Sequence, residues 1–513
     1  MTDTLFTRMR ELGIDVERSQ QILERFNAGE YDNITPVEPS GIPGVDGRQV
    51  VDRTQTVELN LPEQQYRTRL RELAPEIPAD RFGTVSGSGP EALRNLDQDA
   101  LQAIGVLLYP YLSYGVLNGG SATSYGDLKK NESFDSSLLE LYRPEFERLA
   151  PEVTGRPKGI TPAWLNPDGT PGASFLELKF RMLLLAAEHY RTLAAKHGVS
   201  PPESLSPVLP FFEMTSHATE DALRDAYRGY RESPLLKDLP GVKEALDTRH
   251  AVQPLLAALT HSDRGRPKQF FTEAWGKIGE PLGIPGGHGQ NFQVLAPIYR
   301  ELRRQGKRFV YLGNVDNLGF TVDPVSLAFM ALRGAPAAFD FAYRTPVDVK
   351  GGVLVFDQDK NLNCADIGAA ISKDEVFRAE SRGEKILFNC ATGLFDLDNL
   401  CDNLDAILDG LPMRISDQHK DAGKYSQAEQ VTWEVIAMLK EPIVFGIDKY
   451  RRFLAAKMLL ETLLTSGLHA DQAVSSQPTA RNLHEGLKTI LTEEYGMELR
   501  NRRWVPRAPR AWS

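Results

Sequence analysis

The chain has 513 residues, of which 41% are hydrophobic and 25% charged, proportions typical of a folded globular protein with room for about three domains. The 59 Lys and Arg residues against 69 Asp and Glu residues give a formal net charge of -10, which argues against a protein organised around nucleic acid or an anionic membrane surface. Cys364, Cys390 and Cys401 have neither the number nor the spacing of a disulfide framework or a structural zinc site, so we expect a cytoplasmic protein.

The first 95 residues predict a peripheral, mostly helical region. Apolar side chains recur at helical spacing over residues 4–26 and indicate a helical hairpin on the surface. Stretches rich in proline and glycine follow at residues 35–47 and 81–90, so we expect this region to end near residue 95. The most apolar window, residues 100–117, is interrupted by Gly105 and Pro110 and predicts a buried helix followed by a strand, with no membrane span.

The middle of the chain has the pattern of a parallel α/β sheet. Apolar runs at residues 114–117, 208–214 and 309–312 end in polar or glycine-rich turns, and a helical pattern follows each turn. Residues 349–367 predict an antiparallel hairpin added to this sheet. Beyond residue 427 the sequence becomes helical again and ends in an arginine-rich tail. We therefore expect an N-terminal region at 1–95, a catalytic domain at 96–425 and a helical C-terminal region with a basic tail at 426–513.

Three segments carry candidate chemistry. Gly119 and Gly120 follow a short strand, where backbone N–H groups can cradle a phosphate, although such a pair also forms ordinary turns. His288 stands among glycines, so its side chain either points into a cleft or is simply part of a flexible surface loop. Asp316 follows the strand at residues 309–312, a position suited to a Mg²⁺ ligand and equally to a helix N-cap.

Five motifs, in the order LNGGSATSYG, PGGHGQ, GNVDNLGFTVD, DVKGG and KILFNCATGLF, resemble those of the UTP-glucose-1-phosphate uridylyltransferase (UDP-sugar pyrophosphorylase) family. The resemblance spans residues 114–459. It implies an α/β fold: a Rossmann-like nucleotide-diphospho-sugar transferase domain with helical N-terminal and C-terminal additions. It also implies UTP and a sugar 1-phosphate as substrates and Mg²⁺ as cofactor, with no nucleic-acid or membrane partner and an unknown oligomeric state.

The resemblance implies a role for each matching residue. UTP would contact Leu117, Asn118, Gly119, Gly120, Met214, Gln253, Gly287 and Lys457. The sugar phosphate would contact His288, Asn314, Asp366 and Asn389, and Asp316 would hold Mg²⁺. Lys457 falls in DKYRRFLAAK, which resembles a family segment that carries a lysine reaching the triphosphate.

The sequence departs from the family at a second lysine. The family places a catalytic lysine five residues beyond the glycine that matches Gly126, and this chain has Asn131 there. Lys130 and Lys129 lie just before it, and we expect Lys130 to take the role, with Lys129 as the alternative. The predicted catalytic residues are therefore Lys130, Lys457 and Asp316.

The expected reaction makes UDP-glucose and pyrophosphate from UTP and glucose 1-phosphate. Such a transfer needs positioning and charge neutralisation, not a protein nucleophile. Two alternatives remain: a pyrophosphorylase for another sugar 1-phosphate such as N-acetylglucosamine 1-phosphate, and a catalytically impaired protein that binds a UDP-sugar.

Overall fold

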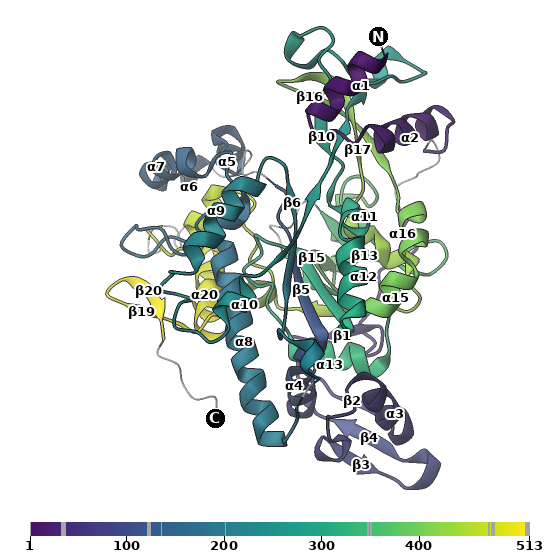
Figure 1. The fold of residues 1–513 in the computed structure, drawn as a ribbon, viewed down its shortest axis with the longest axis vertical. Helices are drawn as coiled ribbons and strands as arrows, with labels where there is room; N and C mark the ends of the chain where they lie inside the picture. Colours follow the sequence, from purple (N-terminus) through teal and green to yellow (C-terminus); the bar gives the residue numbers. More distant parts are fainter. Residues whose placement is uncertain are drawn as a thin grey trace.

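A ten-stranded sheet forms the centre of the computed structural model, which describes residues 2–31, 37–120, 125–134, 136–200, 202–345, 348, 351–469, 472 and 478–507. Its main path runs β1-β18-β12-β15-β11-β5-β6-β7 (Figure 1). These strands are β1 (Val50–Asp52), β5 (Leu112–Leu117), β6 (Phe211–Ser216), β7 (Arg249–Gln253), β11 (Phe309–Asn314), β12 (Ala337–Tyr343), β15 (Leu387–Asp396) and β18 (Ile443–Ile447).

Strands β11, β5, β6 and β7 are parallel neighbours, as the alternation of apolar runs and helical patterns predicts. Only β15 lies antiparallel within the main path, between β11 and β12. Every residue of β5 and β6 is buried, because helices cover both faces of the sheet. The expected hairpin is present as β13 (Gly352–Phe356) and β14 (Leu362–Asp366), and β13 joins the sheet beside β15.

Alternate residues of the central strands feed two separate hydrophobic clusters. Phe211 packs in the larger one and its neighbour Phe212 in the other, on the opposite face. The first face is covered by α4 (Gln98–Leu107), α8 (Phe175–His197) and α13 (Pro324–Arg333). The second is covered by α11 (Asn291–Val294), α12 (Ala296–Arg304), α15 (Leu397–Asp402) and α16 (Leu404–Gly410). Figure 1 shows these two layers on either side of the sheet.

The longest helix, α8, carries side chains that reach the middle of the molecule. Ser174 caps its start by accepting the N–H of Glu177 at 3.3 Å, and Gly198 ends it with φ +66°. Close to α8, the helices α18 (Leu459–Thr465) and α20 (Pro478–Glu493) complete this side, and β19 (Met497–Arg500) pairs with β20 (Arg503–Pro506).

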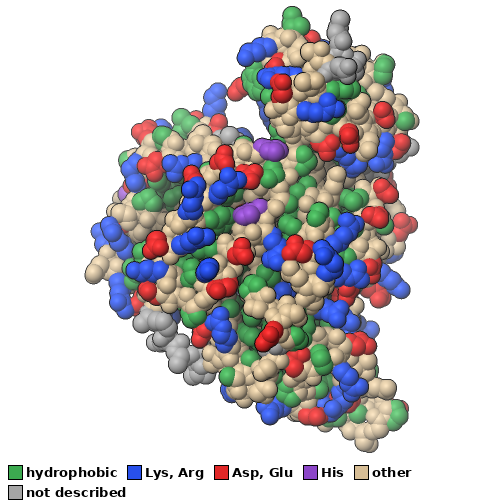
Figure 2. Space-filling view, viewed as in Figure 1, with side chains coloured by type: hydrophobic (Ala, Val, Ile, Leu, Met, Phe, Trp, Pro, Cys, Tyr) green, Lys and Arg blue, Asp and Glu red, His purple; other side chains and the backbone are tan. Residues whose placement is uncertain are grey.

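A lobe at one end of the sheet holds the expected N-terminal helical hairpin. Helices α1 (Thr2–Glu11) and α2 (Val16–Asn27) pack there with three short strands and a longer hairpin, at the top of Figure 1. The strands are β8 (Leu255–Ala257), β9 (Leu259–Thr260), β10 (Gly283–Pro285), β16 (Arg414–Lys420) and β17 (Gly423–Glu429). In the same view, Figure 2 shows a notch between this lobe and a second lobe of α5 (Leu128–Phe134), α6 (Ser136–Leu141) and α7 (Arg143–Val153).

Both predicted terminal regions contain strands in addition to the expected helices. Residues 1–95 contain α3 (Glu63–Leu73) and the sheet of β2 (Leu59–Pro62), β4 (Leu93–Leu96) and β3 (Thr84–Ser86), and β1 lies in the main sheet. Residues 426–513 contribute β18 to that sheet, and residues 432–438 form a 3₁₀ helix where an α-helix was expected. Strands of three to five residues are too short to show a reliable period in the sequence.

The remaining helices are short or peripheral: α9 (Glu220–Tyr230), α10 (Val242–Ala245), α14 (Lys373–Ser381) and α17 (Lys449–Arg452). Within the described parts of the chain, none of the helices combines the length and apolar character that crossing a bilayer requires. The three cysteines are free thiols.

Candidate active site

Most of the residues expected to bind substrate line one cavity of about 250 Å³. It lies at the carboxyl ends of four parallel strands, β5, β6, β7 and β11, where open α/β sheets bind their ligands. Its lining consists of Leu117, Asn118, Gly119, Gly120, Lys158, Met214, Gln253, Pro285, Gly287, His288, Asn314, Val315 and Asp316. Two larger cavities, of about 420 and 730 Å³, contain none of these residues.

The two glycines after β5 keep the wall of this cavity open. A β-carbon on Gly119 would lie 3.0 Å from Oε1 of Gln253, and one on Gly120 would meet no atom within 4 Å. Both glycines line the cavity, so their backbone can be reached from it, and phosphate binding there stays a prediction. The next part of the loop, residues 121–124, lies outside the described residues.

Asn118 acts inside the protein. Its side chain is buried, where Nδ2 donates to Oε2 of Glu213 at 3.0 Å and Oδ1 accepts the N–H of Gly159 at 3.1 Å. The N–H of Lys158 donates to the Gly120 carbonyl at 3.3 Å. Asn118 and Gly120 thus anchor the segment that carries Lys158 against the end of β5.

Among the residues that the structure describes, Lys158 is the one ammonium group that lines this cavity. Its Nζ forms an ion pair with Oδ2 of Asp316 and lies 5.3 Å from the centre of the Tyr125 ring. The side chains of Lys158 and Asp316 are 16% and 13% exposed, so both charges are partly shielded from water. A cation and a carboxylate therefore meet beside the glycine loop, as the handling of phosphate charge requires.

The glycine-rich loop before α11 is fixed by its neighbours. Gly287 has φ +81°, and a β-carbon there would lie 2.4 Å from the carbonyl oxygen of Gln430, so only glycine fits. Gln253 donates to the carbonyl of Gly287 at 2.8 Å and to Oε1 of Gln290 at 2.6 Å. Oε1 of Gln290 also accepts the N–H of Gly286 at 3.1 Å, so Gln290 orders the loop.

His288 is held in one orientation. The N–H of Thr432 donates to its Nδ1 at 3.0 Å, so the neutral ring carries its proton on Nε2. Burial, together with the charge of nearby Lys457, lowers the pKa of His288 to about 4. The side chain is thus a neutral donor at the wall of the cavity, which agrees with the predicted cleft position.

The donor set allows a Mg²⁺ ion only with help from a substrate. No group of three or more His, Cys, Asp or Glu side chains within the described ranges is placed to hold a metal. Of the described lining residues, Asp316 alone offers a carboxylate to the cavity, and Mg²⁺ in phosphoryl-transfer sites is commonly held by one or two carboxylates plus substrate phosphates and water. The residues present fit that mode of binding.

Comparison with known protein families finds a match that includes part of this site. The family model described as UTP-glucose-1-phosphate uridylyltransferase matches residues 280–484. The matched part contains the loop of Gly287 and His288 and the segment of Asp316, so the resemblance seen in the motifs is confirmed there.

Curated relatives of the UTP-glucose-1-phosphate uridylyltransferase family extend the match. A Schizosaccharomyces pombe protein described as a probable UTP-glucose-1-phosphate uridylyltransferase is 26% identical over 299 residues, covering 57% of this chain and 52% of that protein. The enzyme of that name from Pyrus pyrifolia is 29% identical over 198 residues, covering 37% of this chain and 40% of its own length. The chain therefore matches about half or less of the length of these relatives.

Solved structures confirm the fold. A Trypanosoma brucei protein named UDP-glucose phosphorylase has a TM-score of 0.54 and 17% identity, covering 98% of this chain and 80% of its own. A mutant UDP-glucose pyrophosphorylase of Leishmania major in complex with UDP-glucose also has a TM-score of 0.54, with 18% identity, covering 90% and 78%. The nucleotide-diphospho-sugar transferase fold expected from the sequence is present.

The lysine expected from the uridylyltransferase family is not at the cavity. Lys130 lies exposed on α5, where its N–H donates to Oδ1 of Asp127 at 2.8 Å, and it is absent from the cavity lining, as is Lys129. Asn131 is buried, and its Oδ1 accepts the N–H of Leu460 at 2.9 Å. This position joins α5 to α18 instead of facing a phosphate.

Lys457 lies near the cavity without lining it. It is exposed in the irregular segment between α17 and α18. Its charge acts on His288 and on Glu461, and Glu461 also feels the charge of Lys158. Both lysines thus lie close enough to Glu461 for their charges to lower its pKa.

Asp366 and Asn389 lie away from the cavity lining. Oδ2 of Asp366 accepts from Arg414 at 2.8 Å, and Arg414 also pairs with Glu434, two residues beyond Thr432. Asn389 uses its Oδ1 to accept the N–H of Ala391 at 2.8 Å. Burial raises the pKa of Glu434 to about 7, even though Arg414 opposes the shift.

Sequence reasoning missed Lys158, although a signal for it exists. The lysine stands in Arg156-Pro157-Lys158-Gly159, where proline and glycine hold a short turn. The spacing of the resembling family places the lysine five residues beyond Gly126. In this chain, three helices within residues 127–153 intervene before the chain returns to the cavity at Lys158.

Proposed function

We propose that this protein transfers the uridylyl group of UTP to glucose 1-phosphate, forming UDP-glucose and pyrophosphate. The observation that carries the proposal is the convergence of the glycine loop, His288, Asp316 and Lys158 on one cavity at the carboxyl ends of the sheet. The names of the relatives support the choice of UTP and glucose 1-phosphate. The three free thiols support a reducing compartment, and we propose the cytoplasm.

The proposed chemistry needs no protein nucleophile. A phosphate oxygen of glucose 1-phosphate forms a bond to the α-phosphorus of UTP, the bond from that phosphorus to the β-phosphate oxygen breaks, and pyrophosphate leaves with the electron pair. The backbone N–H groups near Gly119 and Gly120 hold phosphate oxygens, and the neutral His288 donates from Nε2. Asp316 would hold Mg²⁺, which supplies neutralisation of phosphate charge when bound.

We assign to Lys158, in place of Lys130, the positive charge that stabilises the phosphates in the transition state. Lys158 lines the cavity, where the substrate phosphates would replace Asp316 as the partner of its ammonium group, and Asp316 would be the residue that holds Mg²⁺. Lys457 would add a second positive charge near this site, where its charge acts on His288 and Glu461. Positioned charges of this kind stabilise a transition state in which phosphate charge is redistributed.

Pyrophosphate release from UTP, Mg²⁺ and a panel of sugar 1-phosphates tests the proposal. We expect turnover with glucose 1-phosphate to exceed that with N-acetylglucosamine 1-phosphate and to require UTP. Equal or greater turnover with another sugar would redirect the proposal to that sugar. UDP-glucose binding by calorimetry without turnover in either direction would instead identify a nucleotide-sugar-binding protein.

A further inference from the structure

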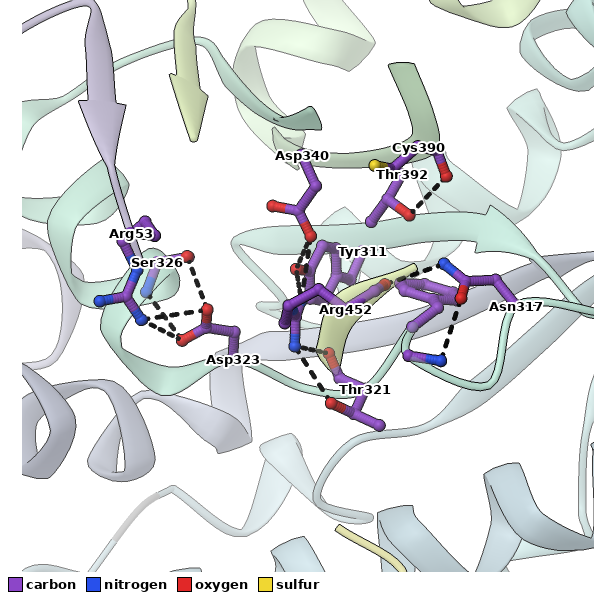
Figure 3. Close-up of polar contacts among 12 residues, drawn as sticks. Arg53, Tyr311, Asn317, Thr321, Asp323, Ser326, Asp340, Cys390, Thr392 and Arg452 are labelled. Carbon is purple, nitrogen blue, oxygen red and sulfur yellow. Dashed lines mark hydrogen bonds and ion pairs between the residues drawn. The ribbon is translucent and has the colours of Figure 1, made fainter. Parts of the chain in front are cut away.

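Arg452 lies behind the cavity, at the end of α17, and bonds to three parts of the fold at once. Its Nη2 donates to the Tyr311 hydroxyl at 2.7 Å and to Oδ2 of Asp340 at 3.0 Å. Its Nη1 donates to the carbonyl and to Oγ1 of Thr321, at 3.2 and 3.1 Å. Figure 3 shows the guanidinium between these side chains. Strands β11 and β12 and the loop after β11 are thus joined through one side chain.

The backbone next to this guanidinium runs along the loop that carries Asp316. The carbonyl of Arg452 accepts from Nδ2 of Asn317 at 3.2 Å, and the N–H of Ala456 donates to the carbonyl of Asp316 at 3.3 Å. Lys457 follows Ala456 directly. The segment that ends in Lys457 is therefore hydrogen-bonded to the residue proposed to hold the metal.

The contact between the two segments has little freedom to slide. The N–H of Leu318 donates to the carbonyl of Leu454 at 3.0 Å, between the two bonds just described. A β-carbon on Gly319 would lie 2.2 Å from the carbonyl carbon of Arg452, so the backbones touch and any larger residue would separate them. A shift of α17 would thus move both Asp316 and Lys457.

The partners of Arg452 indicate a role in setting position. Its side chain is 15% exposed and that of Asp340 is 4% exposed, and pairs buried in this way often add little net stability over an apolar contact. The planar fork of an arginine instead fixes direction, because its donors engage acceptors on two strands and one loop simultaneously. Neither Arg452 nor Asp340 lines the cavity of Asp316.

We propose that Arg452 is a positioning residue that sets the placement of Asp316 relative to Lys457. The inference rests on the proposed function for its effect on turnover, but the coupling of the two segments stands independently of it. Misplacement of reacting groups by about 1 Å can cost about 100-fold in rate, so the coupling has a measurable consequence.

Arg452→Lys tests the proposal because it keeps a positive charge and loses the fork. The matched control is Arg451→Ala: this neighbour is 55% exposed and pairs with Glu493 on α20. We expect Arg452→Lys to lower kcat about 10- to 100-fold, to raise the Mg²⁺ concentration for half-maximal activity and to leave KM for UTP within about threefold. Arg451→Ala should leave all three near normal.

Hydrogen exchange separates this inference from the proposed activity. In Arg452→Lys, and in the milder Asp340→Asn, amides of residues 316–319 and 453–457 should exchange faster together, at a temperature where both proteins remain folded. Unchanged exchange in both segments, or faster exchange in only one, would overturn the coupling even if wild-type protein showed no turnover. Normal kcat for Arg452→Lys in an active enzyme would overturn its effect on the reaction.

Discussion

Replacing Lys158 by alanine removes the ammonium group from the cavity wall while leaving the sheet and the glycine loop intact. At an effective dielectric constant of about 20, two unit charges about 4 Å apart interact by about 4 kcal/mol, before desolvation is subtracted. A net loss of about 3 kcal/mol in the transition state corresponds to roughly a 100-fold fall in kcat. The free energy of unfolding should fall by only about 1 kcal/mol, because Asp316 loses its partner in a cavity that water can enter.

Steady-state pyrophosphate release, with UTP and glucose 1-phosphate both varied, measures this effect. Lys130→Ala is the matched control, because that lysine is exposed on α5 and should lose less than about threefold in kcat. Thermal unfolding of both variants checks that the fold survives. A Lys158→Ala enzyme with near-normal kcat, beside a Lys130→Ala enzyme reduced 100-fold, would refute the assignment and restore the residue expected from family spacing.

Three further outcomes follow from the site. Asp316→Asn should abolish Mg²⁺-dependent turnover with little change in melting temperature; retained turnover in Mg²⁺ would exclude the metal role. Because the pKa of His288 is lowered from 6.5 to about 4, the unfolded chain binds the proton more readily, and stability should fall as pH drops from 6.5 towards 4, by at most about 3 kcal/mol. Urea unfolding of His288→Asn should show less of this loss, and an identical pH dependence would contradict the burial. Gly287→Ala should destabilise the protein by about 2 kcal/mol or more in the same assay, because its β-carbon meets Gln430; an unchanged midpoint would show that the loop can move away.

Strands β5, β6 and β11 were predictable because each is an almost fully buried apolar run followed by a turn. Met214 and Asn314, at the ends of two of these strands, line one cavity, whereas Gln253 ends β7, a strand that the apolar runs did not indicate. Lys158 could not be placed in the same way, because its position depends on a tertiary hydrogen bond between Asn118 and Gly159. The three-residue strand β1 escaped notice since its pairing with β18 is a long-range contact with no local period.

The hydrogen bond from Gly159 to Asn118 has a consequence for how such chains are compared. This bond fixes the segment of Lys158 against the loop next to β5. The position of the ammonium group therefore does not depend on the number of residues between the glycine loop and Lys158. Helices can be gained or lost in that interval, at a closure cost that grows only with the logarithm of its length. On the proposed assignment of Lys158, an alignment that demands constant spacing after the glycines would select the wrong lysine in a relative whose interval has grown.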